Sequence, residues 1–291
     1  MIIPGRAHLG HILKYVGRPL ILLFAWDVAV TAAYYYFTPH WIEFPALPLT
    51  LLGSAVAVYL SFRNTTAYAR WWEARTLWGA MVNSSRTLAR ELGTLLPAGA
   101  AVAPLVHRQV AYVHALRLHL RRQSPWEELQ RLLPPEELDE LRRVTNVPQA
   151  ILTRTAGMIR QTDVEAIRHV AIERTLGELT NAQGGLERIK NTPLPQQYAT
   201  YPALFTHAFC ILLPLGLVET LGLYTPLGST AAGFLFLALL QIGNDIQNPF
   251  ENTENDVPMT AITRAIEIDL RDGLGEQHGL TPLTPEAGVL W

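Results

Sequence analysis

The chain has 291 residues, of which 49% are hydrophobic and only 16% are charged. A soluble domain usually carries about 25% charged residues, so this composition argues against an ordinary soluble protein and against a disordered chain. The single cysteine, Cys210, excludes a disulfide framework and a cysteine-rich metal site. The formal net charge of -2 provides no field that would attract nucleic acid, and no nucleic-acid partner is expected.

Lysine and arginine are distributed very unevenly along the chain. All 23 of them lie within residues 6–18, 63–190 and 264–271. The intervals without basic residues contain four apolar runs, each close to the roughly 20 residues that cross the hydrocarbon core of a bilayer. These runs are residues 19–37, 46–62, 203–224 and 226–243. They predict four membrane-spanning helices in two hairpins.

Basic residues flank the outer ends of the first hairpin, and the connections within both hairpins lack them. By the positive-inside rule, both termini and the central region therefore face the cytoplasm. The expected organisation is a cytoplasmic N-terminal segment (1–18), a first transmembrane hairpin (19–62), a cytoplasmic helical region (63–202), a second transmembrane hairpin (203–243), and a cytoplasmic C-terminal segment with its tail (244–291).

The central region is predicted to be helical, since strand signals are scarce there. Residues 67–96 continue the second apolar run without a break, which predicts one helix that leaves the bilayer and enters the cytoplasm. Pro134-Pro135-Glu136-Glu137 is typical of a helix start, and Asn191-Thr192-Pro193 is typical of a helix end. The Gly- and Pro-rich residues 273–291 predict an irregular tail.

Sequence signatures of catalysis are mostly missing, so no enzyme activity and no cofactor are expected. The nine histidines are scattered and favour surface or packing roles, because His114 and His119 do not have the spacing that directs two side chains at one metal ion. Asp27 and Glu219 lie inside apolar runs, where an ionised group costs at least ~2.5 kcal/mol near the centre of a bilayer. Two interpretations stay open: both line a polar path, or each is paired structurally or lies near a helix end.

The segment after the second run is the most informative in the chain. It contains Phe62-Arg63-Asn64, Tyr68, Arg70, Glu73-Ala74-Arg75 and Leu77-Trp78-Gly79, with Trp71 and Trp72 between them. Aromatic rings interleaved with charges suit a helix that passes through the lipid headgroup layer. The predicted membrane-interface motif is Arg63, Asn64, Tyr68, Arg70, Trp72, Glu73 and Trp78.

This segment resembles the bestrophin family, whose bacterial members carry a very similar stretch after their second membrane helix. Residues 191–195 (Asn-Thr-Pro-Leu-Pro) and residues 245–258, which begin Asp-Ile-Gln-Asn-Pro-Phe, also match in order and spacing. The resemblance implies an all-α homopentameric ion channel in the inner membrane of a cell. Its partners would be four further copies of the chain, small monovalent ions and the lipid bilayer.

In bestrophins, one stripe of the second membrane helix lines a narrow pore neck. Carried over to this sequence, the stripe is Ser54, Val58 and Phe62, whose spacing places them on one face of a helix. Rings of Val and Phe would form an apolar constriction able to block ions by dewetting. Relatives usually have a bulkier apolar residue where this chain has Ser54. Periodicity alone would favour a face that contacts lipid or another helix.

The family also has a cytoplasmic aperture, formed here by the region 163–175. The alignment does not separate Ile167 from Arg168: five Ile would make an apolar aperture, whereas five Arg would attract anions.

Animal bestrophins bind calcium through consecutive acids after an Asn-Pro-Phe motif. The corresponding acidic loop here includes Asn248, Pro249, Phe250, Glu251, Glu254 and Asp256. Its acids are separated by uncharged residues, whereas calcium prefers six to eight oxygen ligands including several carboxylates. We therefore expect neither a metal site nor tight calcium gating.

The sequence thus predicts a pentameric channel with an apolar neck and leaves the sign of the permeant ion open. Most of the family passes chloride and other anions, while some bacterial relatives pass cations. The alternative is a membrane-anchored interaction or sensory protein that does not conduct. A weaker third possibility is a membrane enzyme with Asp27 and Glu219 as acid and base.

Overall fold

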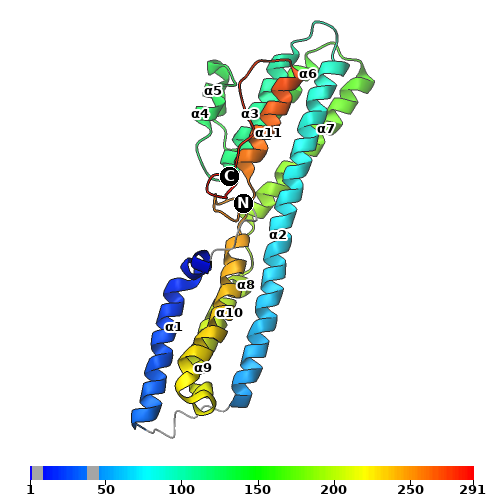
Figure 1. The fold of residues 1–291 in the computed structure, drawn as a ribbon. Coiled ribbons are helices and arrows are strands. Elements are labelled where there is room, and N and C mark those ends of the chain that lie inside the picture. The colour runs from blue at the N-terminus through cyan, green and yellow to red at the C-terminus, as the bar shows by residue number, and fades with distance from the viewer. Residues whose placement is uncertain (2–8, 38–45) are drawn as a thin grey trace. The chain divides into compact units, whose positions relative to one another are not determined.

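The computed structural model describes residues 1, 9–37 and 46–291 (Figure 1). Within these ranges the chain is helical apart from turns, loops and one isolated β-bridge between Glu286 and Val289. The predicted scarcity of strands is confirmed for this part of the chain. Arg6 of the N-terminal segment and the connection between the first two apolar runs lie outside the described residues.

The chain divides into two compact units. The hairpin unit comprises Pro4–Arg70 and Pro193–Asn248, and the bundle unit comprises Met1–Ile3, Trp71–Thr192 and Pro249–Trp291. Helix α2 (Ala46–Leu95) has 50 residues and contributes to both units. The prediction that the second apolar run continues as one long helix is therefore confirmed.

The hairpin unit contains the apolar helices of the chain. Besides the first part of α2, its elements are α1 (Leu9–Phe37), α8 (Gln196–Ala199), α9 (Tyr201–Leu221), η2 (Gly222–Tyr224) and α10 (Thr225–Ile246). Two of its stretches, Val16–Phe37 and Gln196–Ile246, are long and apolar enough to cross a membrane. The expected turn between the third and fourth runs is confirmed by η2, which joins α9 to α10.

Helix α1 begins ten residues before the apolar run that predicted it, and it contains Pro19. Proline removes one backbone hydrogen bond and usually kinks or ends a helix. Here Val16 and Leu23 are buried on either side of Pro19, in a cluster with Cys210 and Leu237. Packing of both flanks against α9 and α10 therefore holds the helix together across the proline.

Glycines allow the helices of the hairpin unit to approach closely. A Cβ atom added to Gly216 of α9 would lie 2.4 Å from a side-chain carbon of Leu49 on α2. One added to Gly233 of α10 would lie 2.2 Å from a side-chain carbon of Leu23 on α1. Small residues at helix contacts are typical of membrane proteins, where association depends on close packing because lipid tails are as apolar as the side chains.

The bundle unit surrounds a separate apolar core. Its helices are the second part of α2, α3 (Val102–Leu120), α4 (Trp126–Leu129), α5 (Pro135–Leu141), α6 (Val147–Arg160), α7 (Ala166–Asn191) and α11 (Met259–Gly273). Fully buried Trp78, Leu116, Leu179 and Ile266 belong to this core. The helix start at Pro134-Pro135 and the helix end at Asn191 are both confirmed.

The residues after α11 form an irregular tail, as predicted. The tail returns to the start of α11, where the backbone N–H of Ala261 donates a hydrogen bond of 2.6 Å to the carbonyl of Trp291. Near the other end of the tail, Glu276 accepts hydrogen bonds from His107 of α3 and Arg271 of α11. The tail is thus fixed to the bundle unit at both ends.

Candidate functional site

The stripe predicted to line a neck lies on an exposed face of α2. Val58 is 56% exposed and Phe62 is 64% exposed, and Ser54 is exposed on the same face. The Ser54 hydroxyl donates a hydrogen bond of 2.9 Å to the carbonyl of Thr50, one turn earlier. The opposite face of α2, with Leu49, Val56 and Leu60, packs against α9 and α10. Much of the side-chain surface of the stripe is therefore left uncovered by the described part of the chain.

Behind this stripe lies an apolar cavity of about 390 Å³ between α2, α9 and α10. Ser54 and Gly53 line it from α2, together with Phe209 of α9 and Phe236 of α10. The rings of Phe209 and Phe236 contact each other in a tilted arrangement, with 4.7 Å between their centroids and 56° between their planes. At Ser54, the stripe therefore adjoins volume that no described side chain of the subunit fills.

Arg63 follows Phe62 directly but points into the protein, where its side chain is completely buried. Its Nε donates to the carbonyl of Tyr198 over 2.8 Å, and one terminal nitrogen donates to the carbonyl of Leu240 over 3.1 Å. The other terminal nitrogen donates to Asn244 Oδ1 over 2.6 Å and to Gln247 Oε1 over 3.2 Å. The guanidinium thus joins α2 to α10 and to α8.

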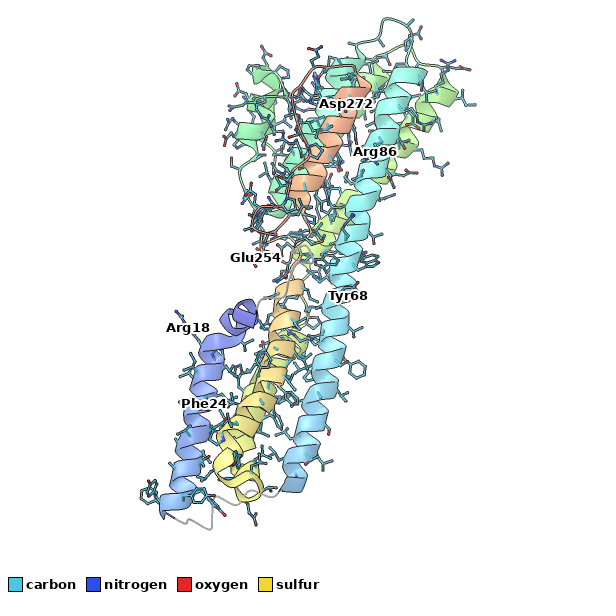
Figure 2. All side chains as sticks on the ribbon, viewed as in Figure 1. Arg18, Phe24, Tyr68, Arg86, Glu254 and Asp272 are labelled. Atoms are coloured by element: carbon cyan, nitrogen blue, oxygen red, sulfur yellow. The ribbon has the colours of Figure 1, made fainter. Side chains whose placement is uncertain are left out.

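The remaining residues of the predicted membrane-interface motif have mixed surroundings. Tyr68 and Trp72 are exposed, and Tyr68 is labelled on α2 in Figure 2. Asn64 donates a 2.8 Å hydrogen bond to the carbonyl of Leu239 on α10, Arg70 is half-buried, and Glu73 forms an ion pair with Arg188 of α7. Trp78 differs from the expectation, because its ring is fully buried in the core of the bundle unit and has no surface that could meet headgroups.

Asp27 is structurally paired, which decides between the two interpretations left open for it. Its carboxylate is buried and accepts hydrogen bonds from Ser229 Oγ at 3.0 Å and from Thr230 Oγ1 at 2.8 Å, both on α10. Glu219 is exposed two residues before the end of α9. The two carboxylates therefore do not form one path in the described structure. The adjacent hydroxyls of Ser229 and Thr230 in an apolar run were the sequence signal for the partners of Asp27.

The two aperture candidates lie at the start of α7. Ile167 is 73% exposed, and the exposed Val170 follows one turn later. Arg168 lies 3.4 Å from Glu165, with both side chains largely exposed. An apolar side chain and a partly neutralised arginine are thus presented next to each other.

The acidic loop after α10 is held by bonds within the protein. Phe250 is buried, Glu251 forms a 2.8 Å ion pair with Lys190, and Glu254 is exposed. Asp256 Oδ1 accepts from Thr253 Oγ1 at 2.6 Å, and Asp256 Oδ2 accepts from the Thr253 backbone N–H at 3.1 Å. Burial raises the pKa of Asp256, although these hydrogen bonds oppose the shift. Among the described residues, no three His, Cys, Asp or Glu side chains gather in a way that could hold a metal ion.

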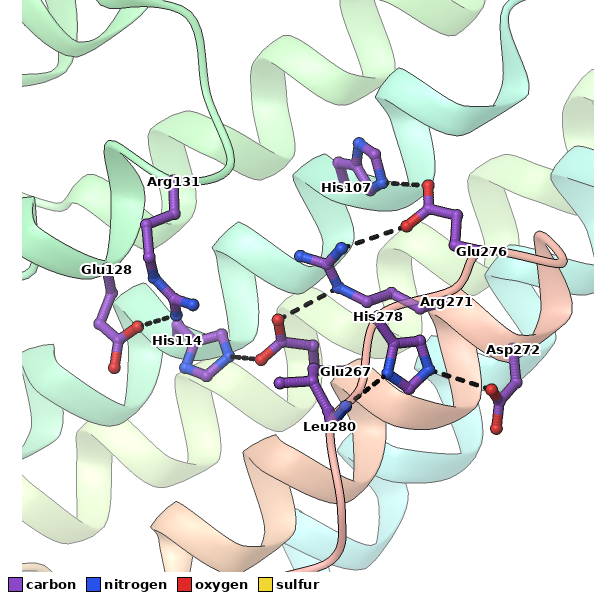
Figure 3. A network of polar contacts seen from close by, with 10 residues as sticks. All are labelled: His107, His114, Glu128, Arg131, Glu267, Arg271, Asp272, Glu276, His278 and Leu280. Atoms are coloured by element: carbon purple, nitrogen blue, oxygen red, sulfur yellow. Dashed lines mark hydrogen bonds and ion pairs between the residues drawn. The ribbon is translucent and has the colours of Figure 1, made fainter.

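Sequence reasoning missed a charged network inside the bundle unit, shown in Figure 3. His114 of α3 hydrogen-bonds to Glu267 of α11, which also accepts from Arg271 at 3.2 Å. Arg271 then bonds to Glu276, which bonds to His107. The spacing of Glu267 and Arg271, four residues apart on a helix, was the available signal.

The hydrogen-bond and charge partners of Glu267 determine its pKa. Burial by itself raises the pKa of Glu267, but the hydrogen bond from His114 and the positive charge of Arg271 outweigh burial and lower the pKa to about 2. Burial lowers the pKa of Arg121 to about 10, with a further contribution from neighbouring Arg117. The network consists of charged side chains that hydrogen-bond to one another, which is typical of structural stabilisation.

Taken together, these features define an all-α membrane protein with an exposed apolar stripe on its longest helix. The family model for bacterial and fungal bestrophin proteins matches residues 6–272, and the chain belongs to the bestrophin family. A voltage-dependent anion channel-forming protein of Ralstonia nicotianae is 34% identical over 92% of this chain and 90% of its own length. The voltage-dependent anion channel-forming protein YneE of Escherichia coli is 34% identical over 90% and 87%.

The fold is also similar to solved bestrophin structures. The crystal structure of a bacterial bestrophin homologue from Klebsiella pneumoniae covers 89% of this chain and 98% of its own, with a TM-score of 0.86 and 32% sequence identity. The resemblance to the bestrophin family and the all-α fold expected from the sequence are therefore confirmed.

Proposed function

We propose that this protein is an anion channel in which five copies of the chain enclose one pore. The observation that carries the proposal is the stripe of Ser54, Val58 and Phe62, which is exposed on one face of α2 while the other face of the helix is packed. The similarity to anion channel-forming relatives over about nine-tenths of the chain supports the same function.

What one chain is able to enclose supports the proposed pentamer. Among the described residues, the apolar helices of a single subunit pack against one another, and the space between α2, α9 and α10 is lined by mostly apolar side chains. A ring of identical subunits is the simplest closed arrangement that places one helix of each chain around a common axis. In this ring the stripe faces the axis, and Val58 and Phe62 form an apolar neck that dewets when it is narrow.

We assign the cytoplasmic aperture to Ile167. The side chain of Ile167 is exposed, whereas the charge of Arg168 is offset by Glu165. The membrane is the inner membrane of a cell, with residues 19–62 and 203–243 in the bilayer. Both termini and residues 63–202 lie on the cytoplasmic side, as the positions of the basic residues indicate.

Ion flux through purified protein in liposomes tests the proposal. With NaCl at different concentrations on the two sides, an anion channel makes the dilute side negative at zero current, and a cation channel makes it positive. We expect the dilute side to become negative. The opposite sign would contradict anion selectivity, and no flux in a well-folded preparation would favour a membrane-anchored interaction protein.

Crosslinking in mild detergent tests the assembly separately. A ladder that ends at five subunits is expected, whereas a ladder that ends at one or two subunits would contradict the shared pore.

A further inference from the structure

Arg63 carries a buried positive charge whose hydrogen-bond acceptors among the described residues are all uncharged. They are the carbonyls of Tyr198 and Leu240 and the side-chain amides of Asn244 and Gln247. Buried guanidinium groups are usually paired with carboxylates, because an isolated charge is costly to remove from water. Uncharged acceptors satisfy the N–H groups but do not cancel the charge.

The end of α10 compensates for only part of this charge. Asn244 and Gln247 flank the last residue of α10, Ile246, where the helix dipole is equivalent to roughly half a negative charge. Asp245 lies in the same turn, but its carboxylate accepts a 2.9 Å hydrogen bond from Gln241 and is not a hydrogen-bond partner of Arg63. A substantial positive charge therefore remains at the end of the stripe.

The location of this charge gives it a functional consequence. Phe62 and Arg63 are consecutive, yet the Phe62 ring is exposed on the stripe and the Arg63 guanidinium is buried against α8 and α10. Electric fields act over longer distances through protein and lipid than through water, because the dielectric constant is lower. A buried charge behind an apolar wall therefore acts on an ion in the neck without binding it.

From these contacts we infer that Arg63 is a charge-selectivity residue. Its positive charge, repeated in each subunit behind the neck, favours anions over cations at the cytoplasmic end of the constriction. This inference rests on the proposed function. It assigns the preference for anions to one side chain that is buried in the subunit and does not line the pore.

The test uses two variants that remove the charge in different ways. Arg63→Gln deletes the guanidinium, and Asn244→Asp keeps Arg63 and an acceptor oxygen but places a carboxylate against it. We expect each variant to lower the chloride-to-sodium permeability ratio by about threefold or more, because five charges are neutralised together. Arg63→Lys keeps the charge and should keep the ratio close to that of the wild type.

The matched control is Arg90→Gln, which removes one positive charge from an exposed position further along α2. The ratio should not change in this control. A variant that only disturbs folding or closes the pore lowers the current without shifting the reversal potential, so the permeability ratio separates a selectivity role from a positioning role.

Two different results would overturn the inference: one contradicts the proposed function, and the other contradicts only the role of Arg63. A wild-type channel without anion preference contradicts the proposed function itself. An anion-selective wild type whose ratio is unchanged in Asn244→Asp, with the protein folded and conducting, contradicts the role of Arg63 alone.

Discussion

Nε2 of His114 lies 3.0 Å from Oε2 of Glu267, and both side chains are almost completely buried between α3 and α11. Because the ionised carboxylate is able only to accept, His114 donates this hydrogen bond. The pair joins two helices through residues that are 153 positions apart in the chain. Substitutions at this pair therefore test whether buried charged contacts stabilise the bundle unit.

Glu267→Gln should lower the free energy of unfolding by about 3 kcal/mol, the cost of breaking a buried ion pair from one side. Thermal unfolding of the detergent-solubilised protein measures this loss. Asp269→Asn is the matched control, since Asp269 lies on the same helix but pairs with Arg86 at the exposed surface. An exposed pair contributes about 1 kcal/mol at most, so an equal effect of both variants would contradict the structural role of Glu267.

The carboxylate of Glu267 also makes the stability of the protein depend on pH. The pKa of Glu267 is lowered from an ordinary 4.5 to about 2, so its contribution is complete above the ordinary value and is lost as the pH falls towards 2. The difference in stability between the wild type and Glu267→Gln should therefore shrink between about pH 4.5 and pH 2. A difference that stays constant over this interval would show that the charge of Glu267 does not contribute.

Asp27 should stabilise the contact between α1 and α10. Asp27→Leu leaves the hydroxyls of Ser229 and Thr230 without their acceptor and should lower stability by about 1–3 kcal/mol. Asp27→Asn keeps one acceptor oxygen and should cost less. Glu219→Leu, at an exposed position of α9, is the control and should have little effect in the same unfolding assay.

The neck assignment predicts opposite behaviour for two valines of α2. Val58 is exposed on the stripe, whereas Val56 is buried against the hairpin unit. Val58→Ala should raise ion flux through liposomes with little loss of stability, and Phe62→Ala should act in the same direction. Val56→Ala should lower stability by about 1 kcal/mol or more without widening the neck. Unchanged flux in both stripe variants would remove the assignment.

Close packing at Gly216 should tolerate no larger residue. Gly216→Ala places a methyl group 2.4 Å from a side-chain carbon of Leu49, so overpacking should cost about 1–3 kcal/mol. Gly184→Ala on α7 is the control, because a Cβ atom there meets no neighbour within 4 Å. Alanine is the better helix former, so this variant should be neutral or more stable by about 1 kcal/mol.

Calcium should not gate the channel at micromolar concentrations. Both carboxylate oxygens of Asp256 are used by Thr253, and Glu251 is paired with Lys190. Addition of micromolar calcium should leave the current unchanged. A calcium-dependent current that disappears in Asp256→Ala would contradict this expectation.

The helices could be predicted because hydrophobicity and charge are local properties of the sequence. The long α2, the α9–α10 hairpin and the helix end at Asn191 all follow from such patterns. Side-chain partners were harder, because they depend on residues far apart in the chain. Arg63 looks like a headgroup-facing residue in its own segment, and only the carbonyl of Leu240, 177 residues later, shows why it is buried.

Two further residues illustrate the same limit. The sequence allowed Asp27 either to line a polar path or to be paired structurally. The hydroxyls of Ser229 and Thr230, about 200 residues later, decide for the structural pair. Trp78 belongs to a series of aromatic residues that suits the headgroup layer, yet its ring is part of a core assembled from several helices. In both cases the residue type was informative, and the tertiary contact decided its role.

The cavity behind Ser54 has a mechanical consequence for the neck. A helix that is close-packed on every inner side moves only if its neighbours are displaced with it, because packed interiors compress very little. Here Gly53 and Ser54 adjoin unfilled volume, but a Cβ atom added to Gly53 would lie 2.9 Å from the Phe209 ring, so this turn of α2 shifts only if Phe209 moves into that volume while Leu60 stays anchored. Small apolar molecules that fill this volume would restrict the movement of α2 and hold the proposed neck at one width.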